Sequence, residues 1–382
     1  MKNRIVNMAL VAMFGLAVLL RYTGLHFISV DMVEYLLPWY HQLADGGFKA
    51  LLQSSFNYTP PYLYLLFLST FTKPFLTDVV AIKLIPIFFD ACNSFLVYKI
   101  ARIKYPSGKL PILAAAVFAL APTVILNSAY WGQVDSFYTC FLLVCMYFIF
   151  KNKPLPAILS FGIAFSIKAQ AVFLGPFLIL MALKKRLHWV QFGLVPIVYV
   201  LLVLPTLLIG KPVFSVLTVY AAQAGTYNFA SMNAPNLYIF VPPRASSPAV
   251  IIGLSIAAIL VLSWLFINGR RNFKLTSSLL VYLAVISVAC VPFILPKMHD
   301  RYFYPADVFS ILLAFFMPEL WFVAVGYQAI SLLAYSIFLF DQNPVPNLVL
   351  ATILNTTMVI VLLWKQNRLF KNQPDPDPGR TL

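Results

Sequence analysis

Charged residues are scarce in this sequence. They make up 10% of its 382 residues, while 61% of the residues are hydrophobic. Soluble domains are nearer one quarter charged and one half apolar, so the composition excludes a soluble globular protein. With a mean hydropathy of +0.86, the chain is predicted to be an all-α polytopic protein whose partner is the lipid bilayer.

Acidic residues and cysteines are scarcer still. Only 12 Asp and Glu stand against 27 Lys and Arg, which gives a net charge of +15. Because basic residues of membrane proteins gather beside the cytoplasmic leaflet, this excess indicates membrane orientation rather than nucleic-acid binding. The cysteines lie within apolar stretches, so neither a disulfide framework nor a Cys/His metal site is expected. They are Cys92, Cys140, Cys145 and Cys290.

Ten apolar stretches are long enough to cross about 30 Å of hydrocarbon. The apolar run between Lys153 and Lys184 has two basic ends, so we predict that it enters and returns as two short helices with a turn at Lys168. Residues 62–72 are too short to span and are predicted to form a partial or re-entrant helix. The ten spans are expected near residues 1–22, 78–101, 110–128, 134–150, 190–209, 250–267, 276–295, 303–317, 321–340 and 346–364.

This topology places every basic cluster and both termini in the cytoplasm. Residues 1–371 are predicted to form a single integral-membrane domain, and residues 372–382 a flexible cytoplasmic tail. Most unusual polar residues fall in five outer segments. Loops that converge on one membrane face are how a polytopic enzyme or transporter builds a site, so we expect a site on the extracytoplasmic face. The segments are residues 23–60, 129–133, the turn at Lys168, 210–249 and 296–302.

Two of the few acidic residues follow the first span. Asp31 precedes an amphipathic stretch, residues 32–43, so it either caps an interfacial helix or acts as a carboxylate base held over the membrane. Glu34 lies three residues further on, where it would complete a capping-box-like arrangement. Position alone does not separate the two roles of Asp31.

The segment Trp131-Gly-Gln133-Val-Asp135 lies at the mouth of a predicted span. Tryptophan is enriched at membrane interfaces, so Trp131 is explained as an anchor. Asp135 either caps its helix, orients a polar ligand or is a partner of Asp31. Lys168 interrupts an apolar run, and a lysine at membrane depth is a functional candidate unless its amine reaches the surface.

Residues 297–301 place two cations, one imidazole and one carboxylate within five positions. Basic residues are depleted from outer segments, so an anion is the natural partner of this cluster. Arg301 can bind phosphate bidentately, Lys297 adds a point charge, and His299 can donate or buffer a proton. An ion pair between Asp300 and a basic neighbour is the simpler alternative.

Residues 223–240 alternate amides and hydroxyls with aromatic rings, and they include Asn233 and Asn236. Neutral hydrogen-bonding groups beside flat apolar rings suit a carbohydrate, which offers hydroxyls around its edge and C–H groups on its faces. The same composition also describes an ordinary interfacial loop.

Together these motifs resemble the multi-spanning C-type glycosyltransferases, over almost the whole chain. Within them the chain is similar to the prokaryotic mannosyltransferase-like proteins related to the second mannosyltransferase of GPI-anchor assembly. The resemblance rests on the order and sidedness of the motifs. Asp300 stands where the family usually has Glu. The motifs are the acidic first loop, Trp131-Gly-Gln-x-Asp135, Ser166-x-Lys168-x-Gln170, Asn233-Ala-Pro-Asn236-Leu-Tyr238 and His299-Asp-Arg301-Tyr302.

The resemblance implies an inverting enzyme. It would move a hexose, mannose by analogy, from a polyprenyl-phosphate carrier to a hydroxyl of a glycolipid or cell-envelope glycan outside the membrane. Asp31 would be the base. Lys168, Lys297, His299 and Arg301 would steady the departing polyprenyl phosphate. The sugar and acceptor pocket would be formed by Glu34, Trp131, Gln133, Asp135, Gln170, Asn233, Asn236 and Tyr302.

No cofactor is required by this interpretation. A divalent cation shared by Asp31 and Asp135 stays open, but two carboxylates are too few ligands to predict one. The alternative function is a transporter or flippase of lipid-linked saccharides, which would use the intramembrane charges Lys83 and Asp90. Those two residues are seven positions apart on one predicted helix, so a structural pair also explains them.

Overall fold

The computed structural model describes residues 2–226, 229–242 and 247–371, so the predicted tail at residues 372–382 lies outside the described residues. The chain forms two compact units. Unit 1 comprises Met1–Val172 and His188–Tyr227, and unit 2 comprises Phe173–Leu187 and Asn228–Leu382.

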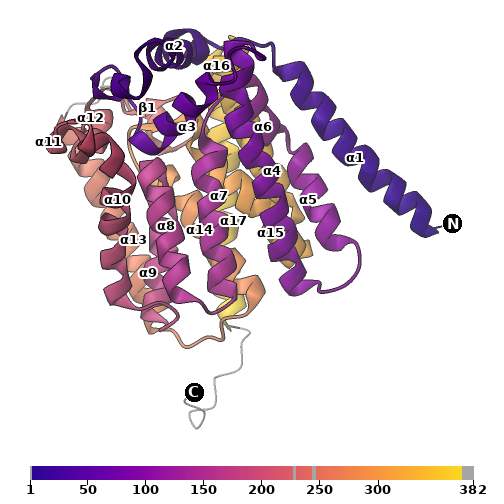
Figure 1. The fold of residues 1–382 in the computed structure, drawn as a ribbon. Helices are drawn as coiled ribbons and strands as arrows, with labels where there is room; N and C mark the ends of the chain where they lie inside the picture. The colour runs from indigo at the N-terminus through magenta and orange to yellow at the C-terminus, as the bar shows by residue number, and fades with distance from the viewer. Residues whose placement is uncertain (1, 227–228, 243–246, 372–382) are drawn as a thin grey trace. The chain divides into compact units, whose positions relative to one another are not determined.

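Unit 1 is a row of helices (Figure 1). Along the row α1 packs on α5, α5 on α4, α4 on α7, α7 on α8 and α8 on α10, while α3 packs against α4, α8 and α10. The helices are α1 (Lys2–Gly24), α2 (Leu37–Gly46), α3 (Pro60–Thr70), α4 (Asp78–Lys104), α5 (Leu110–Leu120), α6 (Pro122–Ile125), α7 (Asp135–Phe150), α8 (Pro154–Ile167), α10 (Leu194–Leu208), α11 (Val213–Leu217) and α12 (Val219–Thr226).

Shorter helical turns join these helices. Two of them are π-helical, Met32–Leu36 before α2 and Leu126–Trp131 after α6. The turns Gly47–Leu52, Ala169–Leu174 and Trp189–Gly193 are 3-10 helices. The predicted short helices at residues 62–72 and on both sides of Lys168 are therefore present, as α3, α8 and α9 (Gly175–Leu183), of which α9 belongs to unit 2.

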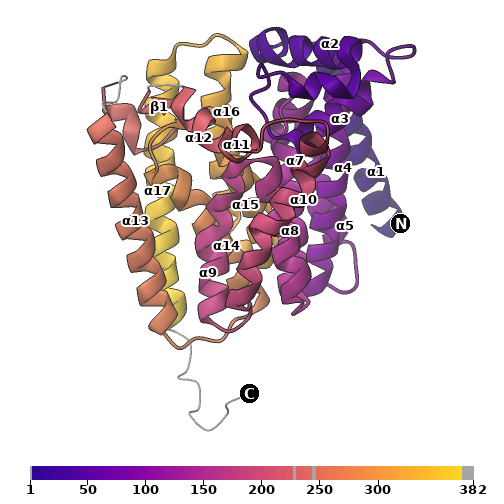
Figure 2. The same ribbon diagram turned by 60° about the vertical axis from the view of Figure 1, so that its left-hand side comes forward.

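Unit 2 is built around α14, whose side chains are almost all buried. Helices α9, α13, α15 and α17 pack on it, and α16 packs on α15 and α17. Figure 2 shows α13 beside α17, where the Trp264 Nε1 donates to Gln366 Oε1 at 3.1 Å. The elements are α13 (Ser247–Arg270), α14 (Ser277–Ile294), α15 (Tyr304–Phe316), α16 (Trp321–Leu339) and α17 (Pro344–Lys371), with the 3-10 turns Leu237–Phe240, Asp300–Phe303 and Pro318–Leu320. Strands β1 (Ser231–Met232) and β2 (Met298–His299) form a two-stranded parallel sheet.

Seven helices of the described residues are long and apolar enough to cross a membrane, and a bent pair makes up to eight. The chain is thus an integral membrane protein, as predicted. The expected ten full spans include two shorter helices, α7 with 16 residues and α15 with 13. Both fall short of the roughly 20 residues that a straight crossing needs.

The bent pair occupies the stretch predicted as one span at residues 110–128. It turns by 52° between α5 and α6. Ala121 precedes Pro122 and takes φ −58° and ψ 122°, because the proline ring disfavours a helical residue before it and removes a backbone N–H donor. The break redirects the chain into the π-helical turn that ends at Trp131.

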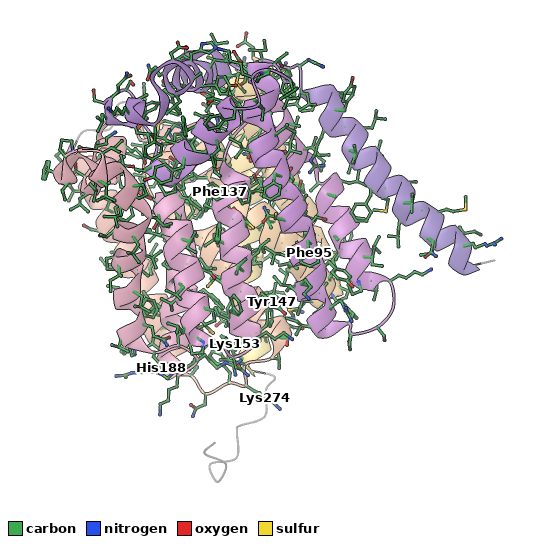
Figure 3. The ribbon with its side chains drawn as sticks, in the orientation of Figure 1. Phe95, Phe137, Tyr147, Lys153, His188 and Lys274 are labelled. Atoms are coloured by element: carbon green, nitrogen blue, oxygen red, sulfur yellow. The ribbon has the colours of Figure 1, made fainter. Side chains whose placement is uncertain are left out.

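In unit 1 the basic clusters gather at those helix ends that lie away from α2 and α3. Helix α4 ends with Arg102 and Lys104, and the connection between α7 and α8 carries Lys151 and Lys153. Figure 3 shows Lys153 at this end, together with His188 before α10. The polar motifs at residues 131–135 and at Lys168 lie together at the other end of these helices. Helices α7 and α8 run antiparallel, so the start of α7 is beside the end of α8.

A buried ion pair ties the first helix of unit 1 to the row. Arg21 donates from Nη2 to Asp90 Oδ2 at 2.9 Å, and Ser128 Oγ donates to the same oxygen at 2.6 Å. Arg21 also donates from Nη1 to Ala119 O at 2.7 Å. The exposed fractions of the two charged side chains are 11% and 2%. The pair is thus enclosed among α1, α4 and the π-helical turn.

Asp90 is therefore not paired with Lys83, the structural partner considered from the sequence. Lys83 is fully buried and donates its ammonium to Gly24 O at 2.8 Å and to Phe27 O. Lys83 and Asp90 are seven residues apart on one helix, which is two turns or about 10 Å. Each therefore pairs with a nearer group: Lys83 with backbone carbonyls at and after the end of α1, and Asp90 with Arg21 of α1.

We predict that Asp90→Asn destabilises the protein by about 3–5 kcal/mol, because it leaves the Arg21 guanidinium buried without a counter-charge. The matched control is Asp78→Asn, since Asp78 pairs with His41 where the side chains are 28% and 51% exposed. That change should cost about 0–1 kcal/mol. Thermal unfolding in detergent measures both, and equal losses would contradict a structural role for the Arg21–Asp90 pair.

Candidate functional site

Asp31 is the centre of a polar cluster in unit 1. Its side chain makes no helix-capping hydrogen bond; instead Ser29 Oγ accepts from the backbone N–H of Met32 at 3.2 Å. The Asp31 Oδ2 accepts from Trp131 Nε1 at 2.9 Å and from Gln133 Nε2 at 2.6 Å. Of the two roles considered from the sequence, capping is therefore performed by a neighbour, and the carboxylate faces the Trp131-Gly-Gln motif.

Gly132 makes this approach between the motif and the Asp31 segment feasible. Its φ of +78° lies in the left-handed region, which residues with a Cβ adopt at a cost. A Cβ at this position would also lie 2.9 Å from Met32 Cε. Ser29 Oγ donates to Trp131 O at 3.2 Å, so the two segments are joined from both sides.

Lys168 and Asp135 form a buried ion pair, with 2.5 Å between Lys168 Nζ and Asp135 Oδ1. Asn127 Nδ2 donates to the other carboxylate oxygen at 2.9 Å. The exposed fractions of the lysine and aspartate side chains are 8% and 0%. The antiparallel α7 and α8 bring these residues together although 33 positions separate them. Lys168 thus lies inside the bundle, and its amine is not at the surface.

Tyr58 links the ion pair to the Asp31 carboxylate. Its hydroxyl donates to Gln133 Oε1 at 3.3 Å, and the ammonium of Lys168 lies 6.0 Å from the centre of its ring. Thr59 Oγ1 donates to Ile167 O at 2.7 Å and fixes this segment next to the end of α8. Sequence reasoning gave Tyr58 no role; the signal was its place beside the Pro60-Pro61 start of α3.

Two predicted members have looser places in unit 1. Glu34 is exposed on the π-helical turn that follows Asp31. Gln170 is half-buried in the 3-10 turn after Lys168, and its Oε1 is buried without a hydrogen-bond partner among the described residues. Neither the exposed carboxylate of Glu34 nor the buried amide oxygen of Gln170 identifies a ligand.

Lys211 is a further cation that sequence reasoning overlooked. It follows α10, at the end of the row where Asp31 lies, and donates from Nζ to Leu51 O at 2.6 Å and to Gln53 O at 3.1 Å. Burial lowers the pKa of its ammonium. A lysine in a segment predicted to lie outside was the signal that could have found it.

In unit 2 the amide-rich loop and the cationic segment are joined by the short sheet. Ser231 and Met232 pair with Met298 and His299. The backbone N–H of Lys297, at φ +61°, donates to Ala230 O at 2.7 Å. The sequence predicted both segments as site candidates, and the structure places them side by side.

The cationic segment is itself partly internal. Asp300 is 4% exposed and accepts from the backbone N–H of Arg301 at 2.9 Å. The Arg301 Nη1 lies 3.8 Å from Asp300 Oδ1, which is the simple ion pair considered from the sequence, in a long geometry. The ring of His299 lies 5.1 Å from that of Tyr302, which in turn lies 6.2 Å from the ring of Phe173.

The two predicted asparagines differ in their surroundings. Asn236 is fully buried, donates from Nδ2 to Leu295 O at 3.0 Å and accepts from the backbone N–H of Tyr238 at 3.0 Å. Its amide therefore holds the loop to the end of α14. Asn233 is half-buried and takes φ +56°, in a bridge to His299.

The residues that the structure describes include no group of three or more His, Cys, Asp and Glu that could hold a metal ion.

We predict that Lys168→Met destabilises the protein by about 3–5 kcal/mol, because it removes the positive charge that Lys168 places 2.5 Å from the buried Asp135 carboxylate. The double variant Lys168→Met/Asp135→Leu should recover most of this loss, since it removes both charges. Thermal unfolding of the single and double variants in detergent measures the coupling. A double variant as unstable as the sum of its parts would show that the pair is not a structural unit.

Neither a protein-family model nor a curated protein matches this chain. Among solved structures, the chain is similar to ArnT from Cupriavidus metallidurans, in a crystal structure with bound undecaprenyl phosphate. The TM-score is 0.54 at 13% sequence identity, and the match covers 94% of this chain and 77% of that chain. The chain therefore shares the all-α fold of ArnT, which confirms the predicted all-α membrane architecture.

Proposed function

We propose that this protein is an inverting glycosyltransferase that uses a polyprenyl-phosphate-linked sugar. It moves a hexose to a hydroxyl of a glycolipid or glycan on the extracytoplasmic side, with mannose the sugar that the sequence resemblance implies. Two findings support the proposal: the fold shared with ArnT, which binds undecaprenyl phosphate in its crystal structure, and the Asp31 carboxylate held by two side-chain donors.

The orientation of Asp31 carries the proposal. Two N–H donors hold one oxygen of its carboxylate, so the direction of the group is set before a substrate binds. In the reaction the acceptor hydroxyl gives its proton to Asp31 while its oxygen attacks the anomeric carbon. The bond from that carbon to the phosphate oxygen breaks, and its electron pair leaves with the polyprenyl phosphate.

The departing phosphate needs positive charge. We assign this role to Lys297, His299 and Arg301, which follow α14 in unit 2, and to Lys168 in unit 1. The charge of Lys168 is already balanced by Asp135 at 2.5 Å, so its part in binding phosphate requires a separate test.

The sugar and acceptor are assigned to the remaining predicted residues. Trp131 and Gln133 contact the base directly. We assign sugar or acceptor contacts to Glu34, Asp135 and Gln170 in unit 1 and to Asn233 and Tyr302 in unit 2, with Tyr58 as an addition because it hydrogen-bonds Gln133. Asn236 contributes by holding its loop, since its amide is occupied by backbone groups.

The transporter alternative loses one of its supports. It would use Lys83 and Asp90 as charges on a pathway through the membrane. Both side chains are buried and engaged in contacts that join α4 to α1 and to the segment after α1, and Asp90 is paired with Arg21. These contacts explain both charges by structure alone.

Asp31→Asn should lower the release of polyprenyl phosphate by about 10²–10⁴-fold, because it removes the general base, while donor binding is retained. The assay uses purified protein in detergent with a polyprenyl-phosphate hexose and candidate acceptors. Asp45→Asn is the matched control, because Asp45 is an exposed carboxylate on α2, and it should keep the wild-type rate. Full activity of Asp31→Asn would refute the mechanism. Lipid transfer across liposomes without donor consumption would favour the transporter.

The double variant Lys168→Met/Asp135→Leu separates the two roles of Lys168. If its ammonium binds the donor phosphate, the double variant should regain stability but have a higher KM for the donor than the single variant Asp135→Leu, which lacks the same carboxylate. The measurement is the donor concentration dependence of polyprenyl phosphate release by the double variant, the Asp135→Leu variant and the wild type. Wild-type KM in the stable double variant would limit Lys168 to a structural role.

A further inference from the structure

A basic pocket lies at the end of unit 1 opposite Asp31. Its volume is about 180 Å³, and it is lined by Lys99, Arg102, Ile103 and Pro106 at the end of α4 and after it, and by Tyr147 and Lys151 at the end of α7. Helices α4 and α7 pack together and run in the same direction, so their final turns lie side by side and line it. No residue of the proposed catalytic cluster belongs to this pocket.

None of the three cations in the pocket is paired with a carboxylate within the described residues. The Lys99 ammonium lies 5.8 Å from the ring centre of Phe95, and the Lys151 ammonium lies 5.7 Å from that of Tyr147. Arg102 donates to Tyr98 Oη and to Pro106 O, each at 3.3 Å. The three charges therefore meet rings and neutral oxygens, and they leave a positive field in the hollow.

The surface of α4 that leads to the pocket is apolar and exposed. Leu84, Phe88 and Phe95 are 40%, 62% and 58% exposed. At 100° per residue these positions, Lys99 and Arg102 fall within about 60° of one another around the helix. From Leu84 to Arg102 the stripe rises about 27 Å, close to the thickness of the hydrocarbon core. Figure 3 shows Phe95 on α4 and, nearer the end that carries Lys153, Tyr147 on α7.

An apolar stripe that ends in a cationic hollow complements an anionic phospholipid, because the hollow can meet the charged headgroup and the half of the stripe next to it, about one leaflet deep, can meet an acyl chain. We propose that this pocket binds the headgroup phosphate of such a lipid in the leaflet at the basic end, with an acyl chain along the stripe of α4. The general preference of basic residues for the cytoplasmic side explains why cations occur at this end. It does not explain why three of them line one hollow without a carboxylate.

Native mass spectrometry of the full-length protein tests the site by titration with phosphatidylglycerol and, separately, with phosphatidylcholine of the same acyl chains. We expect saturable binding of phosphatidylglycerol and a rise in melting temperature with it. The triple variant Lys99→Gln/Arg102→Gln/Lys151→Gln should bind roughly a hundredfold more weakly, since each cation contributes to the attraction. The matched control, Lys104→Gln/Lys109→Gln/Lys153→Gln, removes the same charge from the same end and should bind like the wild type.

Three results would overturn the proposal. Equal binding of phosphatidylcholine would remove the role of the headgroup charge, and equal weakening by the control triple would reduce the effect to general electrostatics. The same stabilisation by inorganic phosphate alone would assign the hollow to a soluble anion. If the triple variant does not fold, Arg102→Gln and Lys151→Gln are tested singly, because both side chains are exposed and each change should still weaken binding.

Discussion

The hydrogen bonds from Trp131 and Gln133 to Asp31 are the interaction on which the account of this protein depends. Both donors come from one short segment, which the break at Pro122 and the left-handed Gly132 direct towards the residues after α1. An aspartate in a flexible outer loop would point in many directions. Here the helical turn after α1 holds the backbone of Asp31, and the side chains of Trp131 and Gln133 orient its carboxylate. A general base requires such a fixed orientation.

The charged side chains of unit 1 have two kinds of surroundings. The enclosed ones are compensated one by one: Arg21 by Asp90, Lys168 by Asp135, and Lys83 by backbone carbonyls. In a medium of low dielectric an uncompensated charge would be costly, so these contacts belong to the scaffold. In the described residues the cations of the basic pocket meet only rings and neutral oxygens. The cations of the basic pocket can therefore meet a ligand without the loss of a buried ion pair, whereas a phosphate at Lys168 would share the ammonium with Asp135.

Much of the fold could be predicted from the sequence because hydropathy and charge sidedness are strong signals. The basic residues at both ends of residues 154–183 correctly predicted two short helices on either side of Lys168. The short apolar run at residues 62–72 correctly predicted a helix too short to span the membrane. Span lengths were less accurate, since proline breaks one stretch at Ala121 and α7 and α15 are short.

The candidate residues could be chosen by residue type, whereas the sequence did not predict their pairings. Ser29 rather than Asp31 caps the helix, and Asp135 meets Lys168 across a helical hairpin; spacing along the chain reveals neither. The Asn236 side chain is an amide of the kind that binds sugars, but it is buried and its hydrogen bonds hold its own loop in place. Such distinctions depend on which partner lies nearest in space, and only the folded structure supplies that information.

The most direct test of the account is the anomeric configuration of the product, measured by NMR while intact-protein mass spectrometry follows the enzyme during turnover. A base at Asp31 and a single displacement predict an inverted anomeric centre and no sugar attached to the protein. Retention of configuration would contradict the single displacement, and a glycosyl group on Asp31 would show that this carboxylate is a nucleophile rather than a base.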